Sequence, residues 1–266
     1  MANSKKRESI NRLFDKLYTK SNGAQVIKFS NKELKVITQN TKFMNQFDAV
    51  KYDSSIKLPE SLKKQGYFIM HLGQGYHAFI KGDGYHKFEE ISDKKEFKVS
   101  KSLIDEVSES EAGAASFIYN EKILQDFLGI SELKVHTARR TKFSYSFEVS
   151  GNQLYAKNQQ IEIDGLFETK DNKIIIGIEA KNEEYPDFEI RQLFNIMKYF
   201  EMLKDKGSIP SNVKIIILFL IRLRDKKGDI VRIYQYRFKD KNDLNSIEFI
   251  KGKKYIIKHI NDSILN

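Results

Sequence analysis

The chain has 266 residues, of which 40% are hydrophobic and 31% are charged, a composition typical of a folded globular protein. It contains no cysteine, which excludes disulfides, thiolate zinc sites and cysteine nucleophiles. The longest apolar run, Ile215–Ile221, is far shorter than the roughly 20 residues of a membrane span, so we expect no membrane association.

The net charge of +10 favours a polyanionic partner, and its distribution is uneven. Residues 1–100 and 213–266 carry net charges of +8 and +7, whereas residues 101–212 carry −5. An acidic middle between basic flanks suits a metal site inside a phosphate-binding surface. A proteome rich in lysine and isoleucine would also raise the pI. No apolar leader follows Met1, so we expect a cytoplasmic protein.

The first hundred residues predict helices followed by a hairpin. A helix is expected over residues 8–19, and two strands over 66–72 and 76–80 flank the turn Gly73-Gln74-Gly75. This order is compatible with a winged-helix DNA-binding module. Because residues 93–102 are highly charged, the chain is divided into an α+β DNA-binding region, 1–100, and a second domain, 101–266. Tyr76 is interpreted as an ordinary core or surface aromatic.

The second domain predicts a mixed α/β fold. A helix capped by Ser108 or Ser110 is expected to end at Gly129, with Ser108 and Glu111 fitting a capping box. The expected later elements are strands over 144–149, 154–156, 160–168, 173–181, 213–222 and 230–238, and a helix over 188–204. The apolar strand 213–222 is expected to be central, buried on both faces. The expected architecture is a mixed sheet flanked by helices.

Ionisable side chains interrupt two of these strands. Period-two alternation places Glu162 and Asp164 on one face of the first strand, and Glu179 and Lys181 on one face of the second. Burying such charges among isoleucines is costly unless something compensates for it. A divalent cation is one compensation, and an ordinary cross-strand salt bridge is the simpler alternative.

The donor types suit phosphodiester hydrolysis. Mg²⁺ prefers hard oxygen ligands and retains water, so Asp164, Glu179 and the carbonyl of Ala180 would be sufficient. Such an ion polarises the scissile phosphate and activates a water. Lys181 would orient that water, or act as its base if the lysine pKa is depressed.

Asp164 followed by Glu179-Ala180-Lys181 resembles the signature of the PD-(D/E)XK nucleases, with Ile163 at the proline position. The likeness covers residues 108–222 and extends to the type II restriction endonucleases of that superfamily. It lies in the segments Arg139-Arg140, Phe143–Phe147, Gln160–Glu168, Glu179–Lys181 and Phe188–Phe194. The first hundred residues match nothing specific.

The resemblance implies a restriction-endonuclease-like fold and Mg²⁺-dependent cleavage of both strands of a short DNA sequence. It also implies a homodimer acting on double-stranded DNA, with a cognate DNA methyltransferase as its functional partner. One alternative is a structure-specific or repair nuclease, such as a Holliday-junction resolvase. Another is a non-catalytic DNA-binding regulator, although an inactive domain would be expected to lose one acid or the lysine.

Supporting residues are expected around this core. The candidates for catalytic support are Glu162, Gln192 and either Glu109 or Glu111. A polar side chain exposed to solvent on a strand or helix, or a helix cap, would explain each of them equally well. Basic side chains before and after the acidic hairpin are expected to contact the DNA backbone. These candidates are Arg139, Arg140, Lys142 and Arg191.

Overall fold

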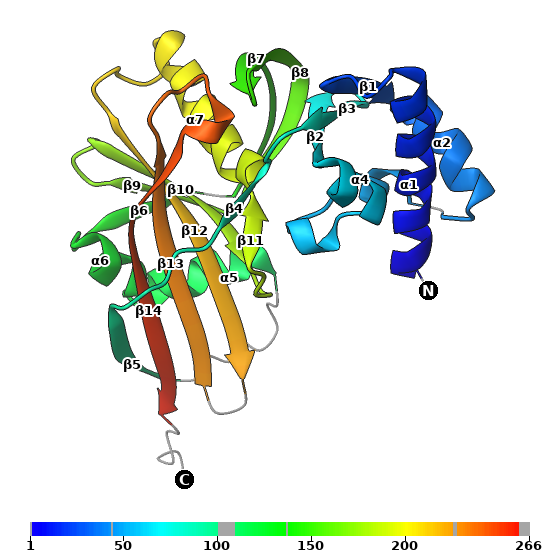
Figure 1. Cartoon of the computed structure of the whole chain (residues 1–266). Coiled ribbons are helices and arrows are strands. Elements are labelled where there is room, and N and C mark those ends of the chain that lie inside the picture. The colour runs from blue at the N-terminus through cyan, green and yellow to red at the C-terminus, as the bar shows by residue number, and fades with distance from the viewer. Residues whose placement is uncertain (1, 44, 101–109, 137, 226–227, 261–266) are drawn as a thin grey trace.

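The computed structural model describes residues 2–43, 45–100, 110–136, 138–225 and 228–260. A large mixed sheet carries helices on both faces, and a smaller N-terminal module (residues 2–81) lies beside it (Figure 1). The predicted architecture, a mixed sheet flanked by helices, is confirmed at this level. Within the described residues, no helix is long and apolar enough to cross a membrane.

The N-terminal module packs helices against a three-stranded antiparallel sheet of order β1-β3-β2. Its strands are β1 (Val26–Ser30), β2 (Tyr67–Gly73) and β3 (Tyr76–Lys81). Its helices are α1 (Ala2–Lys20), α2 (Asn31–Asn40), α3 (Gln46–Ala49), the short 3-10 helix η1 (Ser55–Lys57) and α4 (Glu60–Gln65). The predicted first helix and the predicted hairpin are both confirmed.

The large sheet has seven strands in the order β5-β14-β13-β12-β10-β9-β6. Among the described residues, the pairs β10–β12 and β14–β5 are parallel and the other pairs of this sheet are antiparallel. Its strands are β5 (Lys94–Ser100), β6 (Leu133–His136), β9 (Gly165–Thr169), β10 (Ile174–Lys181), β12 (Lys214–Asp225), β13 (Gly228–Phe238) and β14 (Ile247–Ile260).

Among the described residues, two further strand pairs belong neither to this sheet nor to the N-terminal one. The long strands β7 (Arg139–Val149) and β8 (Asn152–Ile163) form an antiparallel hairpin, and β4 (Tyr85–Lys87) pairs with β11 (Asp187–Glu189). A second 3-10 helix, η2 (Leu244–Ser246), precedes β14.

Strand β12 is the middle strand of the large sheet, as its continuous apolar sequence predicts. Its alternate side chains enter two different hydrophobic cores. One core contains Ile216, Leu218 and Leu220 with helices α5 (Glu111–Asn120) and α6 (Ile123–Leu128). The other contains Ile217, Phe219 and Ile221 with helix α7 (Ile190–Asp205).

Three local predictions are wrong. The helix expected up to Gly129 is two helices, because Lys122 adopts a left-handed φ of 60° between them. Glu111 is the first residue of α5 and not the third, since Ser110 is the N-cap and accepts from the amide of Gly113. Ser108 and Glu109 lie outside the described residues.

The third error concerns the acidic hairpin. The single strand expected over 160–168 is divided at Asp164 into β8 and β9, and the short strand expected over 154–156 belongs to the twelve-residue β8. The division turns the chain from the β7–β8 hairpin into the large sheet, where β9 pairs with β10.

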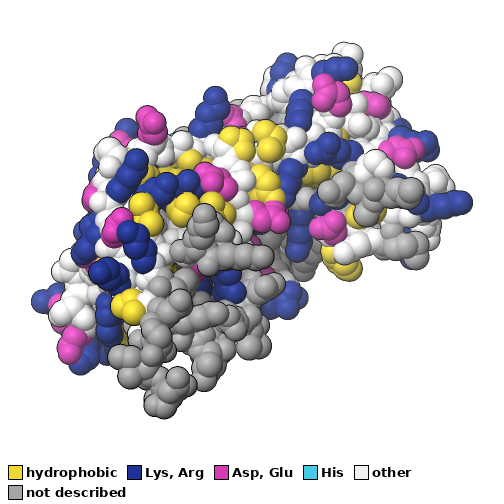
Figure 2. Space-filling view, turned by 90° about the horizontal axis from the view of Figure 1, so that it is seen from below, with side chains coloured by type: hydrophobic (Ala, Val, Ile, Leu, Met, Phe, Trp, Pro, Cys, Tyr) yellow, Lys and Arg dark blue, Asp and Glu magenta, His cyan; other side chains and the backbone are white. Residues whose placement is uncertain are grey.

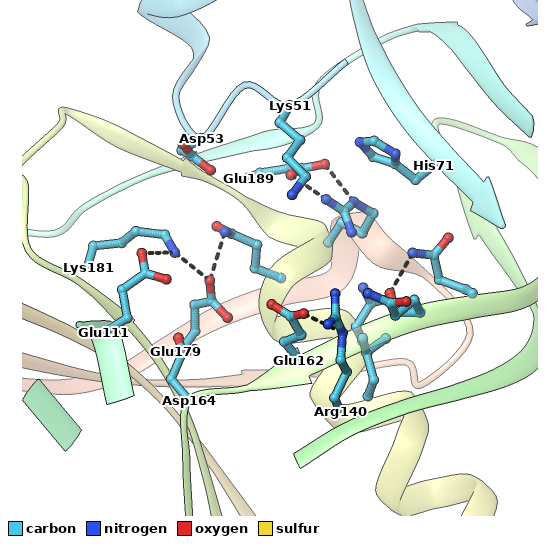
Figure 3. Close-up of a pocket in the computed structure, with 16 residues that line it drawn as sticks. Lys51, Asp53, His71, Glu111, Arg140, Glu162, Asp164, Glu179, Lys181 and Glu189 are labelled. Atoms are coloured by element: carbon cyan, nitrogen blue, oxygen red, sulfur yellow. Dashed lines mark hydrogen bonds and ion pairs between the residues drawn. The ribbon is translucent and has the colours of Figure 1, made fainter. Parts of the chain in front are cut away.

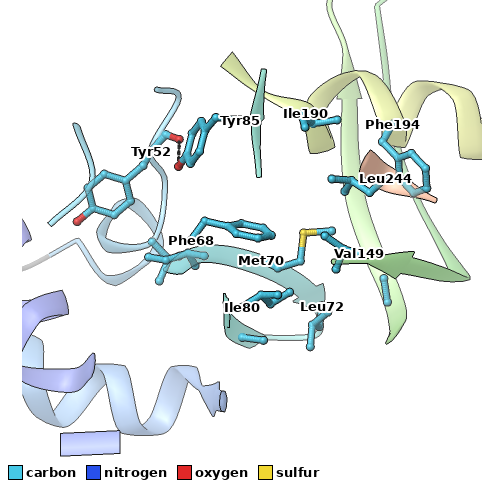
Figure 4. Packing of buried hydrophobic residues seen from close by; sticks show 14 of the residues in the cluster. Tyr52, Phe68, Met70, Leu72, Ile80, Tyr85, Val149, Ile190, Phe194 and Leu244 are labelled. Atoms are coloured by element: carbon cyan, nitrogen blue, oxygen red, sulfur yellow. Dashed lines mark hydrogen bonds between the residues drawn. The ribbon is translucent and has the colours of Figure 1, made fainter. Parts of the chain in front are cut away.

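The N-terminal module is joined to the second part by a continuous hydrophobic core. Figure 4 shows Met70 and Leu72 of β2 near Val149 of β7, with Phe194 of α7 beyond. All four side chains are buried. The spaces between the two parts therefore have walls that are fixed by packing.

Candidate active site

Asp164 lies at the turn between β8 and β9, beside the edge of β10. Its backbone amide donates to the carbonyl of Ile178 at 3.1 Å, and its Oδ2 accepts from the amide of Ala180 at 2.9 Å. The carboxylate is therefore fixed next to the backbone of β10. In an extended strand the N–H and C=O of one residue point to the same side, so the carbonyl of Ala180 also faces the Asp164 edge.

Glu179 and Lys181 lie on the face of β10 opposite the buried Ile178 and Ala180, as alternation predicts. Lys181 Nζ lies 2.8 Å from Glu179 Oε1 and 2.7 Å from the Oε1 of Glu111, at the start of α5. One lysine therefore bridges a strand carboxylate and a helix carboxylate.

These side chains line one cavity of about 370 Å³. Figure 3 shows Glu111, Asp164, Glu179 and Lys181 meeting there. Gln192 of α7 joins them, because its Nε2 donates to Glu179 Oε1 at 2.8 Å. The structure thus brings together five residues that the sequence singles out, from α5, the β8–β9 turn, β10 and α7.

The electrostatics of the cavity reflect burial and an excess of acid. Burial raises the pKa of Glu179 to about 7, although Lys181 opposes that shift. Burial also raises the pKa of Asp164, against the amide of Ala180 and the charge of Lys181. Three carboxylates with one lysine favour an additional cation.

The pKa of Lys181 is raised. Burial lowers it, but the negative charges of Glu179 and Glu111 outweigh that effect. Lys181 therefore stays protonated at neutral pH and can orient a water or a phosphate oxygen. The role as a general base, which required a depressed pKa, is not supported by this arrangement.

The donor set fits a hard divalent cation. Asp164, Glu179 and the Ala180 carbonyl are oxygen donors, and Gln192 Oε1 is a buried acceptor without a hydrogen-bond partner among the described residues. Over the same residues, no cluster of three or more His, Cys, Asp or Glu side chains has a metal-binding arrangement. A site of two carboxylates and a carbonyl leaves positions for water and substrate, as Mg²⁺ prefers.

Glu162 and the basic residues predicted at the hairpin are divided between its two faces. Glu162 is exposed on β8 and pairs with Arg140 of β7 at 2.7 Å, and both line the cavity. Lys142, two residues further along β7, lines a neighbouring cavity. Arg139 points to the opposite face, where its guanidinium lies 5.6 Å from the ring centre of Tyr199.

Arg191 lies in the cavity wall with a partner that the sequence does not reveal. Its Nε and Nη2 donate to the two carboxylate oxygens of Glu189, each at 2.7 Å. Its side chain is 14% exposed. A bidentate buried pair fixes α7 relative to β11 and leaves Arg191 less available to a phosphate than a free surface arginine.

Sequence reasoning missed the residues that the N-terminal module contributes. Lys51, Asp53 and His71 line the same cavity, more than ninety positions before Asp164 in the chain (Figure 3). Burial lowers the pKa of His71 well below its ordinary value, so the ring is neutral. Glu189, Gln159, Gln160 and Asn195 also line the cavity.

The loop that carries Lys51 and Asp53 is fastened to the second part of the chain. Asp187 of β11 accepts from the amide of Ser55 at 2.8 Å and from the hydroxyl of Ser54 at 2.5 Å. No periodicity in the sequence indicates such a contact, since it depends on two segments about 130 residues apart.

Two family models match the chain. Residues 7–79 match the Domain of unknown function (DUF6996), and residues 80–256 match the Domain of unknown function (DUF6997). The models meet within β3, near its C-terminal end, whereas the sequence predicts a division near residue 100. Strand β5 pairs with β14 in the large sheet. No curated protein and no solved structure matches the chain. Since the second model spans most of the chain, this protein belongs to the DUF6997 family.

Proposed function

We propose that this protein is a Mg²⁺-dependent DNA endonuclease of the type II restriction kind. The observation that carries the proposal is the convergence of Asp164, Glu179 and Lys181 in a cavity between the two parts of the chain. Three buried or half-buried ionisable groups of this kind are expensive to maintain without a functional reason.

The arrangement of elements supports a restriction-endonuclease-like fold. Helix α5 covers one face of the sheet and α7 the other, and the acids lie on the antiparallel β9–β10 pair and the turn before it. Strand β12, parallel to β10, follows α7. The N-terminal module, three main helices with a β2–β3 hairpin, supports a winged-helix DNA-binding region.

Each residue of the site has a chemical task in this proposal. Asp164, Glu179 and the Ala180 carbonyl would hold Mg²⁺, and the bound ion would supply Lewis-acid chemistry for the scissile phosphate and a bound water. Lys181 stays protonated and stabilises negative charge on the phosphate. Glu111 and Gln192 hold Lys181 and Glu179 in position through the contacts described above.

Basic side chains extend the proposed DNA contact beyond the cavity. On the face seen in Figure 2, Lys and Arg side chains occur over both parts of the molecule. Arg140 of β7 and Lys51 of the N-terminal module line the cavity of the acids, and Lys142 of β7 lines the neighbouring one. These three side chains would contact backbone phosphates. We further propose a homodimer in the cytoplasm, with one protomer cutting each strand, and a cognate methyltransferase that protects the host DNA.

The test is cleavage of unmethylated phage DNA with Mg²⁺ or with EDTA. Discrete fragments are expected only with Mg²⁺ and only from the wild type and the control Lys173→Ala, which removes an exposed lysine from the turn before β10. Asp164→Asn and Lys181→Met are expected to lose at least a hundredfold in rate. Junction-specific cutting would favour a repair nuclease, and DNA binding without any cleavage would favour a regulator.

A further inference from the structure

A second cavity of about 790 Å³ adjoins the catalytic one, between the N-terminal module and the β7–β8 hairpin. Lys51, His71 and Arg140, which Figure 3 shows at the first cavity, line both cavities. A chain-like ligand whose phosphate lies at the carboxylates therefore has a direct path from one space into the other. The second volume falls within the usual range of small-molecule sites.

One wall of this cavity forms where the backbone of the β2–β3 turn closely approaches β8 and α2. A Cβ on Gly73, at φ +80°, would lie 2.0 Å from the carbonyl oxygen of Lys157 in β8. A Cβ on Gly75, at φ +76°, would lie 2.7 Å from Nδ2 of Asn31. Only glycine permits this contact, so the β2–β3 turn is held against β8 and α2. The cavity is thus part of the folded architecture.

Exposed aromatic rings stand beside cationic side chains at this cavity. Phe47 of α3 and Tyr76 of β3 are 74% and 57% exposed, although both are large and apolar. Arg140 and Lys142 line the same space. Proteins that bind unpaired nucleotides commonly stack the bases on aromatic rings and contact the phosphate backbone with cationic side chains.

The polar part of the wall contains two buried acceptors that lack partners. His77 Nε2 lies 2.9 Å from Asn31 Oδ1, which only accepts, so Nε2 carries the proton and Nδ1 is an acceptor. Among the described residues, His77 Nδ1 and Gln159 Oε1 have no hydrogen-bond partner. Both side chains are less than 10% exposed. Such atoms are costly to bury unless a ligand donates to them.

We propose that this cavity holds one unpaired nucleobase of the DNA strand, stacked on Tyr76 and selected by donation from its exocyclic amino group to His77 and Gln159. The assignment of this base to the DNA strand whose phosphate lies at Asp164 rests on the proposed nuclease function. Adenine, cytosine and guanine carry an exocyclic amino group, whereas thymine has none and presents carbonyls that would face two acceptors. Because pairing in a duplex occupies one of the two N–H groups, donation to both acceptors requires a base from a single strand or one rotated out of the helix.

The test measures binding in EDTA, so that no cleavage is needed. Fluorescence anisotropy is recorded at neutral pH with labelled dA, dC and dT homopolymers of about 12 nucleotides, within the range of single-strand site sizes. The wild type is expected to bind dA and dC about tenfold more tightly than dT. Gln159→Leu is expected to remove this preference by weakening the binding of dA and dC, and Gln159→Glu, which retains the acceptor, is expected to keep it.

Tyr76→Ala is expected to weaken binding of dA and dC about tenfold. Its matched control is Tyr155→Ala, because Tyr155 is also a half-exposed tyrosine, at 55%, but lies on β8 outside the cavity. Circular dichroism melting verifies that each variant is folded. Equal affinity for all three homopolymers, or equal losses from the two tyrosine variants, would overturn the proposal.

The two proposals fail separately. A protein that prefers dA and dC through Gln159 but cuts no DNA retains the base site and loses the nuclease function. A protein that cuts duplex DNA through Asp164 and Lys181 without any base preference retains the function and loses the base site.

Discussion

Replacing Glu179 by glutamine is expected to stabilise the metal-free protein while abolishing cleavage. Burial raises the pKa of Glu179 from 4.5 to about 7. This difference corresponds to about 3 kcal/mol, at about 1.4 kcal/mol per pKa unit. Glutamine has nearly the shape of glutamate and retains an oxygen acceptor, but it carries no charge. Lys181 retains Glu111 as its ion-pair partner.

The sign follows from proton binding. Below pH 4.5 Glu179 is protonated in both folded and unfolded chains. Between pH 4.5 and 7 the unfolded chain loses this proton while the folded protein keeps it, so the stability of the wild type falls as pH rises. Above pH 7 Glu179 is also ionised in the folded protein, and the full destabilisation by its buried charge is present. The advantage of the glutamine variant should therefore be absent near pH 4.5 and complete near pH 8.

The assay is thermal unfolding in EDTA, followed by circular dichroism at pH 5 and pH 8. At pH 8 the variant is expected to melt roughly 6–12 °C above the wild type, from about 2–4 °C per kcal/mol for a chain of this size. The control Glu132→Gln changes a carboxylate that is 60% exposed and should have almost no effect. A variant no more stable than the wild type at pH 8, or an equal gain at both pH values, would refute the reasoning.

Three further predictions concern the metal site, the sheet and the cavity wall. Mg²⁺ should raise the melting temperature more at pH 8 than at pH 6, because protons compete with the metal for Asp164 and Glu179, whose pKa values are raised. Isothermal titration calorimetry in two buffers should detect the protons released when Mg²⁺ binds. Asp229→Ala should destabilise the protein by about 3–5 kcal/mol in urea unfolding, since Arg222, 1% exposed, loses a partner at 2.7 Å. Gly73→Ala should cost at least roughly 2 kcal/mol in the same assay, because its Cβ would meet the carbonyl of Lys157.

The sequence by itself determined the elements whose patterns are local. The alternation of Glu179 and Lys181 with Ile178 and Ala180 indicates a strand with one charged face, and the structure has that strand. The apolar run of β12 predicts burial on both faces, and both faces are covered. These features follow from the periodicity of side chains along a strand, which any short stretch of sequence displays.

Only the tertiary structure decided which distant groups share a cavity. Lys51 and His71 reach the acids because the core of the N-terminal module continues into β7 and α7. The break at Asp164 likewise depends on where other segments lie, because β8 pairs with β7 and β9 pairs with β10. Contacts across a hundred residues result from packing and hydrogen bonding between separate elements, and no local period encodes them.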